Sequence, residues 1–426
     1  MTLPANGFFR VAESGAPSLC DPDLALRTRP SDQHSSFGVN RASSAFTFEM
    51  SPGPSFTLGV EEEYLVVEID GGNLIDEAPV EMFEALERRL GVQVSPEFLQ
   101  CQVEVGTRVA SDLRTVRDEL AMLRGTVAEI TKTFGFGIIA ASTHPFGEAR
   151  AQKRTVKERY TLLAEDLQEV VRRLLISGMH VHVGLDDDAL RIDLMGQVTY
   201  ILPHLLALST SSPFWAGHET GLKSYRLAVW DEMPRTGLPE HFESFAEYER
   251  HVEMLVRAGV IEDGTKLWWD VRPSARFPTL EMRIADLCTR LEDTVCIAAL
   301  YRCWLRMLYR LRRSNQRWRQ YRALLLNENR WRAQRYGTDA GLIDFGRGEL
   351  VPYPELLDEI IELVLPDAEA FGCIEEVAHA RTILARGTSA HWQVDTFNES
   401  LAAGKTHEDA LASVVNMLRE ETLHGV

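Results

Sequence analysis

The chain has 426 residues, of which 45% are apolar and 25% charged, which is ordinary for a globular protein with a large core. Its net charge of −18 argues against a nucleic-acid partner, because phosphate backbones are bound by basic surfaces. No apolar run approaches the ~20 residues that span a bilayer, so we expect no membrane partner. Six scattered cysteines without a close pair, and the lack of a signal-peptide pattern, indicate a reduced, cytoplasmic protein.

Residues 1–50 differ in composition from the remainder. They are rich in Ser, Pro, Ala and Arg and show no sustained hydrophobic period, so we predict a disordered N-terminal extension. Residues 51–426 are regular and are expected to form a single domain, with the strands over 56–290 and a mostly helical part after them.

Hydrophobic periodicity predicts strands and helices in alternation along this domain. Strands are expected at 56–69, 97–105, 136–142, 179–185, 266–272 and 279–285, the last two as a hairpin. Helices are expected at 79–90, 111–134 with Ser111 as N-cap, 153–175, 189–210 with a kink at Pro203, 243–258, 289–335 and beyond 353. Several strands alternate charged and apolar residues, which parallel strands buried on both faces rarely do. We therefore predict an α+β fold with a largely antiparallel sheet that has one polar face and is backed by helices.

Four of the predicted strands carry polar side chains at alternate positions, which places the members of each pair on one face. Acids among apolar residues need partners or a metal ion. If the strands are neighbours, their glutamates converge into an oxygen-rich site of the kind that suits Mg²⁺ or Mn²⁺. Each pair alone is explained as well by a solvated face, an ion pair or two satisfied histidines, but all four together favour a site. The pairs are Glu61 and Glu63, Gln102 and Glu104, His180 and His182, and Glu281 and Arg283.

Arginines in loops or at strand ends supply candidate phosphate ligands, since a guanidinium binds phosphate or carboxylate in a fixed fork. Taken singly, each of them is more often explained by an ion pair that stabilises its loop. The chain has no GxxxxGK[ST] motif, no GxGxxG after a strand and no GxSxG. A nucleotide site here must therefore depend on metal ions and arginines. The arginines are Arg226, Arg235, Arg272 and Arg276.

Eight segments, in order over about 55–290, together resemble the bacterial carboxylate–amine ligases of glutamate–cysteine ligase family 2. The combination is specific, although each segment alone is weak. The segments are FTLGVEEEYLVV (56–67), QVEVGT (102–107), ASTHPF (141–146), SGMHVHVGL (177–185), SYR (224–226), PRTGLP (234–239), WWDVRPS (268–274) and FPTLEMRIADLCT (277–289).

The resemblance implies a glutamine-synthetase-like catalytic core, in which a curved antiparallel sheet holds ATP and Mg²⁺ or Mn²⁺. It implies ATP-dependent joining of a small-molecule carboxylate to an amine through an acyl phosphate, with weak glutamate–cysteine ligase activity. The helical C-terminal half could supply a homodimer surface. By position, the metal-facing residues would be Glu61, Glu63, Glu104, His180 and Glu281. The catalytic residues would be Glu61, Glu281, Arg283 and Arg235, and the nucleotide-binding residues Arg226, Arg272 and Arg276.

Two alternatives stay open at this point. One is a zinc hydrolase that uses His180 and His182, because His-x-His on a strand is a zinc-binding pattern. The other is a binding protein that kept the fold and lost catalysis. Tightly bound zinc would favour the first, and the absence of a thermal shift with ATP and Mg²⁺ would favour the second.

Overall fold

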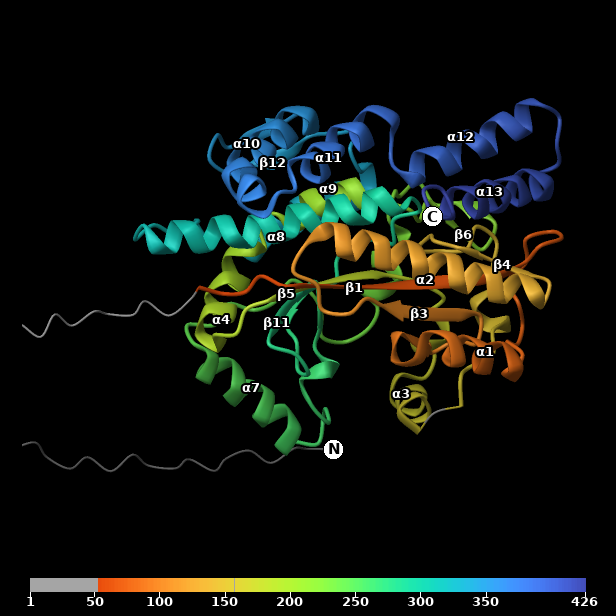
Figure 1. Ribbon diagram of the computed structural model, residues 1–426, viewed down its shortest axis with the longest axis horizontal. Coiled ribbons are helices and arrows are strands. Elements are labelled where there is room, and N and C mark those ends of the chain that lie inside the picture. The colour runs from red at the N-terminus through yellow and green to blue at the C-terminus, as the bar shows by residue number, and fades with distance from the viewer. Residues whose placement is uncertain (1–52, 157) are drawn as a thin grey trace, which may run out of the picture. The chain divides into compact units, whose positions relative to one another are not determined.

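The computed structural model describes residues 53–156 and 158–426, so the predicted extension at 1–50 lies outside the described residues. A seven-stranded sheet forms the middle of this part of the chain, in the order β10-β11-β5-β1-β3-β2, with β4 paired to β1 (Figure 1). All of these pairs are antiparallel, which confirms the predicted α+β class. The strands are β1 (Leu58–Glu68), β2 (Val94–Pro96), β3 (Gln102–Gly106), β4 (Phe136–Ile139), β5 (Met179–Gly184), β10 (Val271–Pro273) and β11 (Thr279–Met282).

Strand β1 runs through the centre of the sheet and shows why the two faces differ. One face is buried and carries Leu58, Val60, Glu62 and Tyr64. The opposite face carries Gly59, Glu61 and Glu63, which are only partly buried. Since side chains alternate along a strand, one face packs against helices and the other stays available for a site.

The helix-covered face is packed by α2 (Leu113–Thr133) and α8 (Leu291–Arg313), which lie side by side over the sheet in Figure 1. Helix α2 begins after Asp112, whose carboxylate accepts a hydrogen bond from the Thr115 backbone N–H at 2.8 Å. The prediction of Ser111 as the N-cap was therefore wrong by one residue, because Asp112 has the extended backbone from which a side chain reaches the third helical N–H.

A fully buried ion pair joins these two helices to β1. The Arg124 guanidinium of α2 lies 2.5 Å from the Glu62 carboxylate. The same carboxylate accepts hydrogen bonds from the Tyr64 hydroxyl at 2.5 Å and from Thr294 of α8 at 2.7 Å. Both oxygens of the buried Glu62 carboxylate thus have hydrogen-bond partners, as a buried charge requires.

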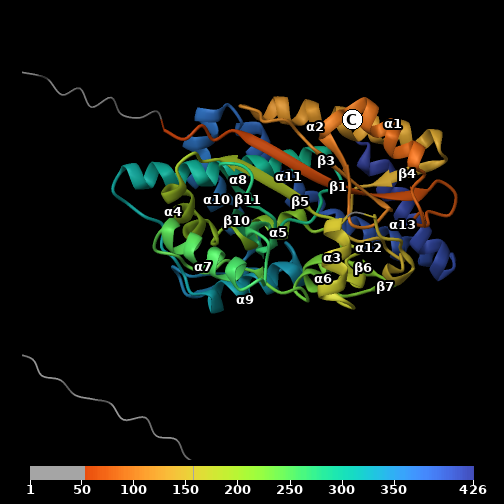
Figure 2. The same cartoon turned by 90° about the horizontal axis from the view of Figure 1, so that it is seen from below.

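On the opposite face of the sheet lie α3 (Glu158–Leu167) and α7 (Phe245–Arg257), at separate ends of that face in Figure 1 and, from below, in Figure 2. The predicted helix 153–175 is much shorter in the structure, because Gln168 has a left-handed backbone with φ 49° that ends α3. Only a 3₁₀ turn, Val171–Arg173, follows.

Two other long helices predicted from the sequence are each divided. The 189–210 segment forms α4 (Asp188–Val198) and α5 (Leu202–Ser209), and Pro203 lies in the first turn of α5, where its missing N–H costs nothing. The 289–335 segment forms α8 and α9 (Ala323–Tyr336).

The remaining elements complete the helical side and the loops around the sheet. None of the helices within 53–156 or 158–426 has the length and apolar character needed to cross a membrane. The helices are α1 (Val80–Leu90), α6 (Tyr225–Trp230), α10 (Tyr353–Phe371), α11 (Ile374–Arg386), α12 (Ser389–Ala402) and α13 (His407–Thr422), and the short strands are β6 (Phe214–Trp215), β7 (His218–Glu219), β8 (Thr236–Gly237), β9 (Trp268–Trp269), β12 (Leu342–Asp344) and β13 (Glu349–Val351).

Candidate active site

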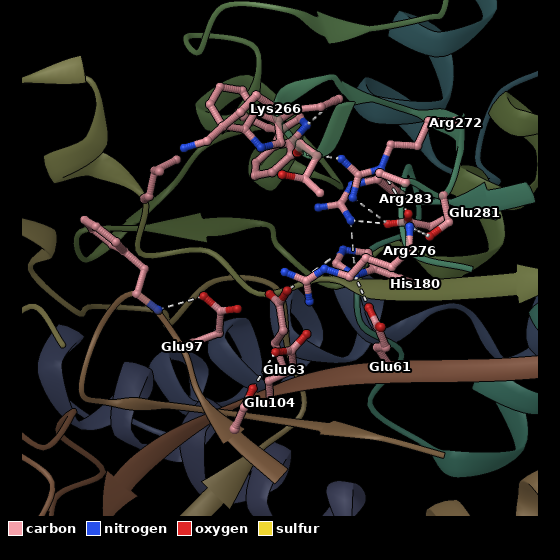
Figure 3. Close-up of a pocket in the computed structure, with 18 of the residues that line it drawn as sticks. Glu61, Glu63, Glu97, Glu104, His180, Lys266, Arg272, Arg276, Glu281 and Arg283 are labelled. Atoms are coloured by element: carbon pink, nitrogen blue, oxygen red, sulfur yellow. Dashed lines mark hydrogen bonds and ion pairs between the residues drawn. The ribbon is translucent and has the colours of Figure 1, made fainter. Parts of the chain in front are cut away.

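Cross-strand register brings the polar residues of four strands into one row on the open face of the sheet. The register follows from burying the alternate apolar residues, since a slip of one residue would turn the carboxylates onto α2 and α8. The row lines a cavity of about 460 Å³ (Figure 3). The residues that lie opposite one another are Glu63 and Glu104, Glu61 and His180, and Glu281 and His182.

One end of the cavity is acidic. Oxygens of Glu63, Glu97 and Glu104 lie within 4.8 Å of one another, and a second group with the same spacing joins Glu104 to Glu61 and His180. Burial and the negative charge of Glu97 raise the pKa of Glu63 to about 8. Burial and the Glu97, Glu61 and Glu63 charges raise the pKa of Glu104 well above its usual range. The carboxylates repel one another, and a hard divalent cation with oxygen ligands would remove that repulsion, so this donor set fits Mg²⁺ or Mn²⁺.

Backbone and hydroxyl donors hold two of these carboxylates in place. The Gly178 N–H donates to Glu63 at 2.7 Å, and the Ser95 hydroxyl donates to Glu104 at 2.7 Å. These neutral donors orient the carboxylates but do not cancel their charge. A cation therefore still has a favourable place between them.

Glu97 was not among the candidates chosen from the sequence. It precedes β3 in an irregular segment, where its carboxylate accepts a hydrogen bond from the Phe98 N–H at 2.7 Å. The period of two that marked the other acids does not extend to this residue. The one available signal was its place seven residues before Glu104. This spacing does not predict where the Glu97 side chain points, because no regular element connects the two residues.

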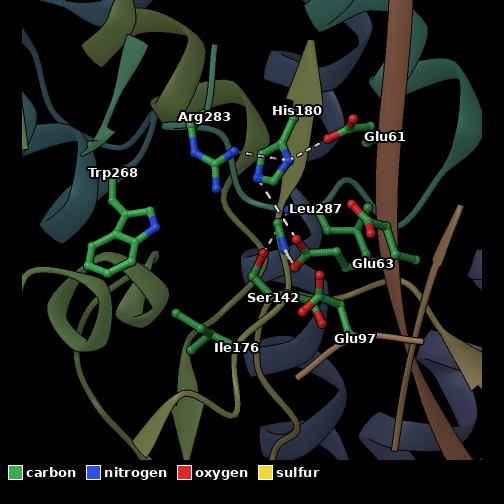
Figure 4. A network of polar contacts seen from close by, with 12 residues as sticks. Glu61, Glu63, Glu97, Ser142, Ile176, His180, Trp268, Arg283 and Leu287 are labelled. Carbon is green, nitrogen blue, oxygen red and sulfur yellow. Dashed lines mark hydrogen bonds and ion pairs between the residues drawn. The ribbon is translucent and has the colours of Figure 1, made fainter. Parts of the chain in front are cut away.

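His180 links the acidic residues to the basic end of the cavity (Figure 4). Its Nδ1 lies 2.9 Å from Glu61, and its Nε2 lies 3.9 Å from Glu63. Burial and the nearby Arg283 guanidinium lower the pKa of His180 to about 4, so the ring is neutral at pH 7. With Nδ1–H donating to Glu61, the lone pair is on Nε2, which is the arrangement of a metal-binding histidine.

His182 has a different environment. Its Nδ1 lies 3.0 Å from the Thr279 hydroxyl, and its Nε2 lies 3.4 Å from Glu61. Burial lowers the pKa of His182, but the hydrogen bond to Glu61 and the charges of Glu281 and Glu61 outweigh burial and raise it. His182 belongs to neither ligand group found in the described part of the chain. Neither ligand group among the described residues therefore contains both histidines that the hydrolase alternative needs.

The other end of the cavity is basic. Glu281 lies between two arginines: Arg272 Nε is 2.9 Å from its carboxylate, and Arg283 forms a second ion pair with it. Burial opposes ionisation of Glu281, but the two guanidinium charges outweigh it and hold the pKa well below its usual range. Glu281 is absent from both ligand groups formed by the described residues, so its metal role stays a prediction. Figure 3 shows Arg272, Arg276, Arg283 and Glu281 on one side and Glu63, Glu97 and Glu104 on the other.

Two of the predicted arginines support the cavity from behind and are not among its lining residues. Buried Arg226 donates to the backbone carbonyl of Arg283 at 3.1 Å. Arg235 donates to the carbonyl of Lys266 at 3.1 Å and lies over the Trp268 ring. Lys266, which the sequence did not single out, does line the cavity. The basic wall thus consists of Arg272, Arg276, Arg283 and Lys266.

Apolar side chains complete the cavity wall. They limit the access of water to the polar groups of the cavity. The arrangement offers cation sites at one end and guanidinium groups at the other, which suits a substrate with several negative charges. The residues are Phe98, Tyr160, Leu174, Ile176, Trp230, Met233 and Trp268.

Comparison with known proteins adds sequence relatives. A family model described as "Glutamate-cysteine ligase family 2(GCS2)" matches residues 57–416. A Rhodospirillum rubrum protein named "Putative glutamate--cysteine ligase 2" is 60% identical over 374 residues, which are 87% of this chain and 96% of that protein. A protein of Jannaschia sp. with the same name is 56% identical over 366 residues, which are 86% of this chain and 96% of that one.

Solved structures share the fold at low identity. A glutamate–cysteine ligase from Francisella tularensis, in complex with AMP, gives a TM-score of 0.62 at 12% identity over 86% of this chain and 88% of that one. A bifunctional glutathione synthetase from Pasteurella multocida gives 0.60 at 18% identity over 86% of this chain. The chain spans about half the length of that synthetase, 52%. The expected glutamine-synthetase-like core is confirmed.

Proposed function

Because the chain belongs to glutamate–cysteine ligase family 2 and is an ATP-dependent ligase that forms a C–N bond, we propose that it activates a substrate carboxylate as an acyl phosphate and joins it to an amine. The observation that carries this proposal is the row of Glu104, Glu63, Glu61 and His180 across three adjacent strands, facing a basic wall in one cavity. The acidic half suits metal ions and the basic half suits phosphates.

Residues of this chain would hold the metal at the acidic end. Glu63, Glu97 and Glu104 form one ligand set, and Glu61 with His180 extends it. Bound Mg²⁺ or Mn²⁺ would offset the negative charge of the nucleotide phosphates. We propose these two ions because oxygen ligands dominate the set.

In the proposed reaction an oxygen of the substrate carboxylate attacks the γ-phosphorus of ATP, and the bond to ADP breaks. The amine nitrogen then attacks the acyl carbon, loses a proton and displaces inorganic phosphate. Arg283, beside Glu281 and His180, would offset charge on the transferred phosphoryl group, while Arg272 and Lys266 would hold the rest of the phosphate chain. No protein nucleophile is needed, so the protein acts by positioning and by charge.

Glutamate and cysteine are the first substrate pair to test, and we expect weak activity with them. The screen measures ADP release with MgCl₂ and ATP across amino acids and amines.

Glu61→Gln and Glu281→Gln should each lower turnover at least 100-fold while the unfolding transition is retained. Glu84→Gln, on the exposed side of α1, is the matched control and should leave turnover unchanged. Retention of most turnover by Glu61→Gln would overturn the proposed metal site. A cytoplasmic location and a homodimer stay predictions from the sequence.

A further inference from the structure

The tip of the β10–β11 hairpin, residues 274–278, lies at the mouth of the main cavity. Phe277 at this tip is 54% exposed, although it is a large apolar side chain. It lines both the main cavity and an adjoining cavity of about 380 Å³ between the tip and α7. An ordered phenyl ring left in water at the junction of two cavities forgoes the free energy of burial until something covers it.

Backbone hydrogen bonds fix the position of this ring. Ser274 N–H donates to the Thr279 carbonyl at 3.0 Å, and Thr279 N–H donates to the Phe277 carbonyl at 2.7 Å. The Ser274 hydroxyl accepts from the N–H groups of Arg276 and Phe277, both at 3.3 Å. The ring meets the His182 imidazole edge-on, with centroids 6.1 Å apart and an 89° angle between the rings. The tip is therefore a preformed turn that holds the phenyl ring at the rim of the cavity.

Arg276, the preceding residue, provides an uncommitted positive charge. Within residues 53–156 and 158–426 its guanidinium makes no hydrogen bond and no ion pair, and it lines the same two cavities as Phe277. Arg272 and Arg283, by contrast, are already paired with Glu281. An aromatic face beside a free guanidinium, at the entrance of a phosphate-binding cavity, matches a ligand that carries both a planar base and phosphates.

We propose that Phe277 stacks on the base of the nucleotide substrate while Arg276 contacts its phosphates. This inference rests on the proposed function, because it names the residue that holds the base of the same ATP. The sheet order supports this end of the cavity for the nucleotide. Arg272 lies in β10, Arg276 lies in the tip and Arg283 directly follows β11, whereas Glu97 and Glu104 lie by β2 and β3 at the opposite edge of the sheet. The phosphates bind toward the guanidinium groups, and the base of the nucleotide then lies near the hairpin tip.

Stacking uses the π-face of any base, so Phe277 should strengthen binding without choosing between adenine and guanine. Alanine substitution of a residue that stacks on one base weakens binding by about 10-fold. Inorganic triphosphate has the phosphates but no base. It therefore separates a stacking role of Phe277 from any general effect of the tip on the shape of the cavity.

The experiment is calorimetric titration of the full chain with MgCl₂ and either a non-hydrolysable ATP analogue or inorganic triphosphate. Phe277→Ala and Phe277→Leu should weaken binding of the ATP analogue about 10-fold and leave triphosphate binding unchanged. Phe277→Trp should retain wild-type binding of the ATP analogue. Arg276→Ala should weaken the binding of both ligands. Trp331→Ala, which removes an aromatic ring that is 48% exposed on α9, is the control and should change neither.

Three results would overturn the inference: wild-type affinity for the ATP analogue in Phe277→Ala, an equal loss for triphosphate, or rescue by leucine. A wild-type protein that binds neither ligand would instead refute the proposed function, and the stacking role with it. The steady-state readout is a higher KM for ATP in Phe277→Ala, with kcat and the KM for the carboxylate unchanged.

Discussion

Replacing Glu104 by glutamine should stabilise the metal-free protein and remove its stabilisation by Mg²⁺. Glu104 belongs to both ligand groups and faces the charges of Glu97, Glu61 and Glu63. Glutamine keeps the shape and can still accept the Ser95 hydrogen bond, but it carries no charge. A site that is built to bind a cation is expected to cost stability when the cation is absent.

The size of the effect has an upper bound. A carboxyl group that is repelled can escape by binding a proton, and at pH 7 this costs about 3.4 kcal/mol for a group whose ordinary pKa is 4.5. The site is partly open to solvent, so we expect Glu104→Gln to raise the free energy of unfolding by about 1–3 kcal/mol. With Mg²⁺ at 100 times its Kd, the wild-type protein should instead gain about 2.7 kcal/mol, and the variant much less.

The pH dependence has a definite sign. Because the pKa of Glu104 is higher in the folded protein than in the unfolded chain, the folded state binds more protons above pH 4.5. Metal-free wild-type stability should therefore fall as pH rises above 4.5, relative to Glu104→Gln, and the two proteins should converge below it.

The assay is urea unfolding followed by circular dichroism, in EDTA and in 10 mM MgCl₂, from pH 4 to 8. Glu84→Gln on α1 is the control for removing a carboxylate elsewhere. A variant less stable than wild type in EDTA, or one with the full Mg²⁺ response, would refute the electrostatic account of the acidic end.

Three further outcomes follow from contacts elsewhere in the fold. Arg124→Met should lower the free energy of unfolding by about 3–5 kcal/mol in urea titrations, because it leaves the Glu62 carboxylate buried without a cation; a loss below 1 kcal/mol would contradict this. His204→Phe should flatten the fall of stability between pH 6.5 and about 4, since burial lowers the pKa of His204 to about 4 and the unfolded chain binds the proton first; an unchanged slope argues against it. Gly178→Ala should reduce kcat at least 10-fold and lower the free energy of unfolding by less than Arg124→Met does. The added Cβ would lie 2.5 Å from the Arg226 guanidinium, which supports Arg283. A wild-type kcat in this variant would show that the support is dispensable.

Alternation along single strands was predictable from the sequence. The pairs at 61 and 63, 180 and 182, and 281 and 283 had to share faces whatever the partner strands were, because the side-chain period of a strand is two. The antiparallel class followed from the same alternation of charged and apolar residues. Both predictions depend only on local backbone geometry. The sheet confirms the antiparallel class and the pairs at 61 and 63 and at 180 and 182, whereas Arg283 lies just past the end of β11 and shares the cavity with Glu281.

Residues outside regular elements were harder to assign. Glu97 lies in an irregular segment, and the loop residue Arg235 proved to lie behind the cavity wall. Arg226 also lies behind the wall, but in the short helix α6, where the sequence had predicted a loop. The sequence has no local rule for the direction of a loop side chain. The middle residue of the Glu61–Glu63 triplet also needed the structure, which shows Glu62 paired with Arg124 on the helical face.

By itself the sequence determined which side chains leave the same face of each strand, and hence that acids, histidines and arginines were available for one polar surface. Only the tertiary structure decided which of them meet. Sheet order and register place Glu63 against Glu104 and give Glu281 to two arginines, so that acidic and basic ends form within one cavity. The physical reason is that charge interactions depend on distances between strands, and these distances are set by the packing of α2 and α8 on the opposite face of the sheet.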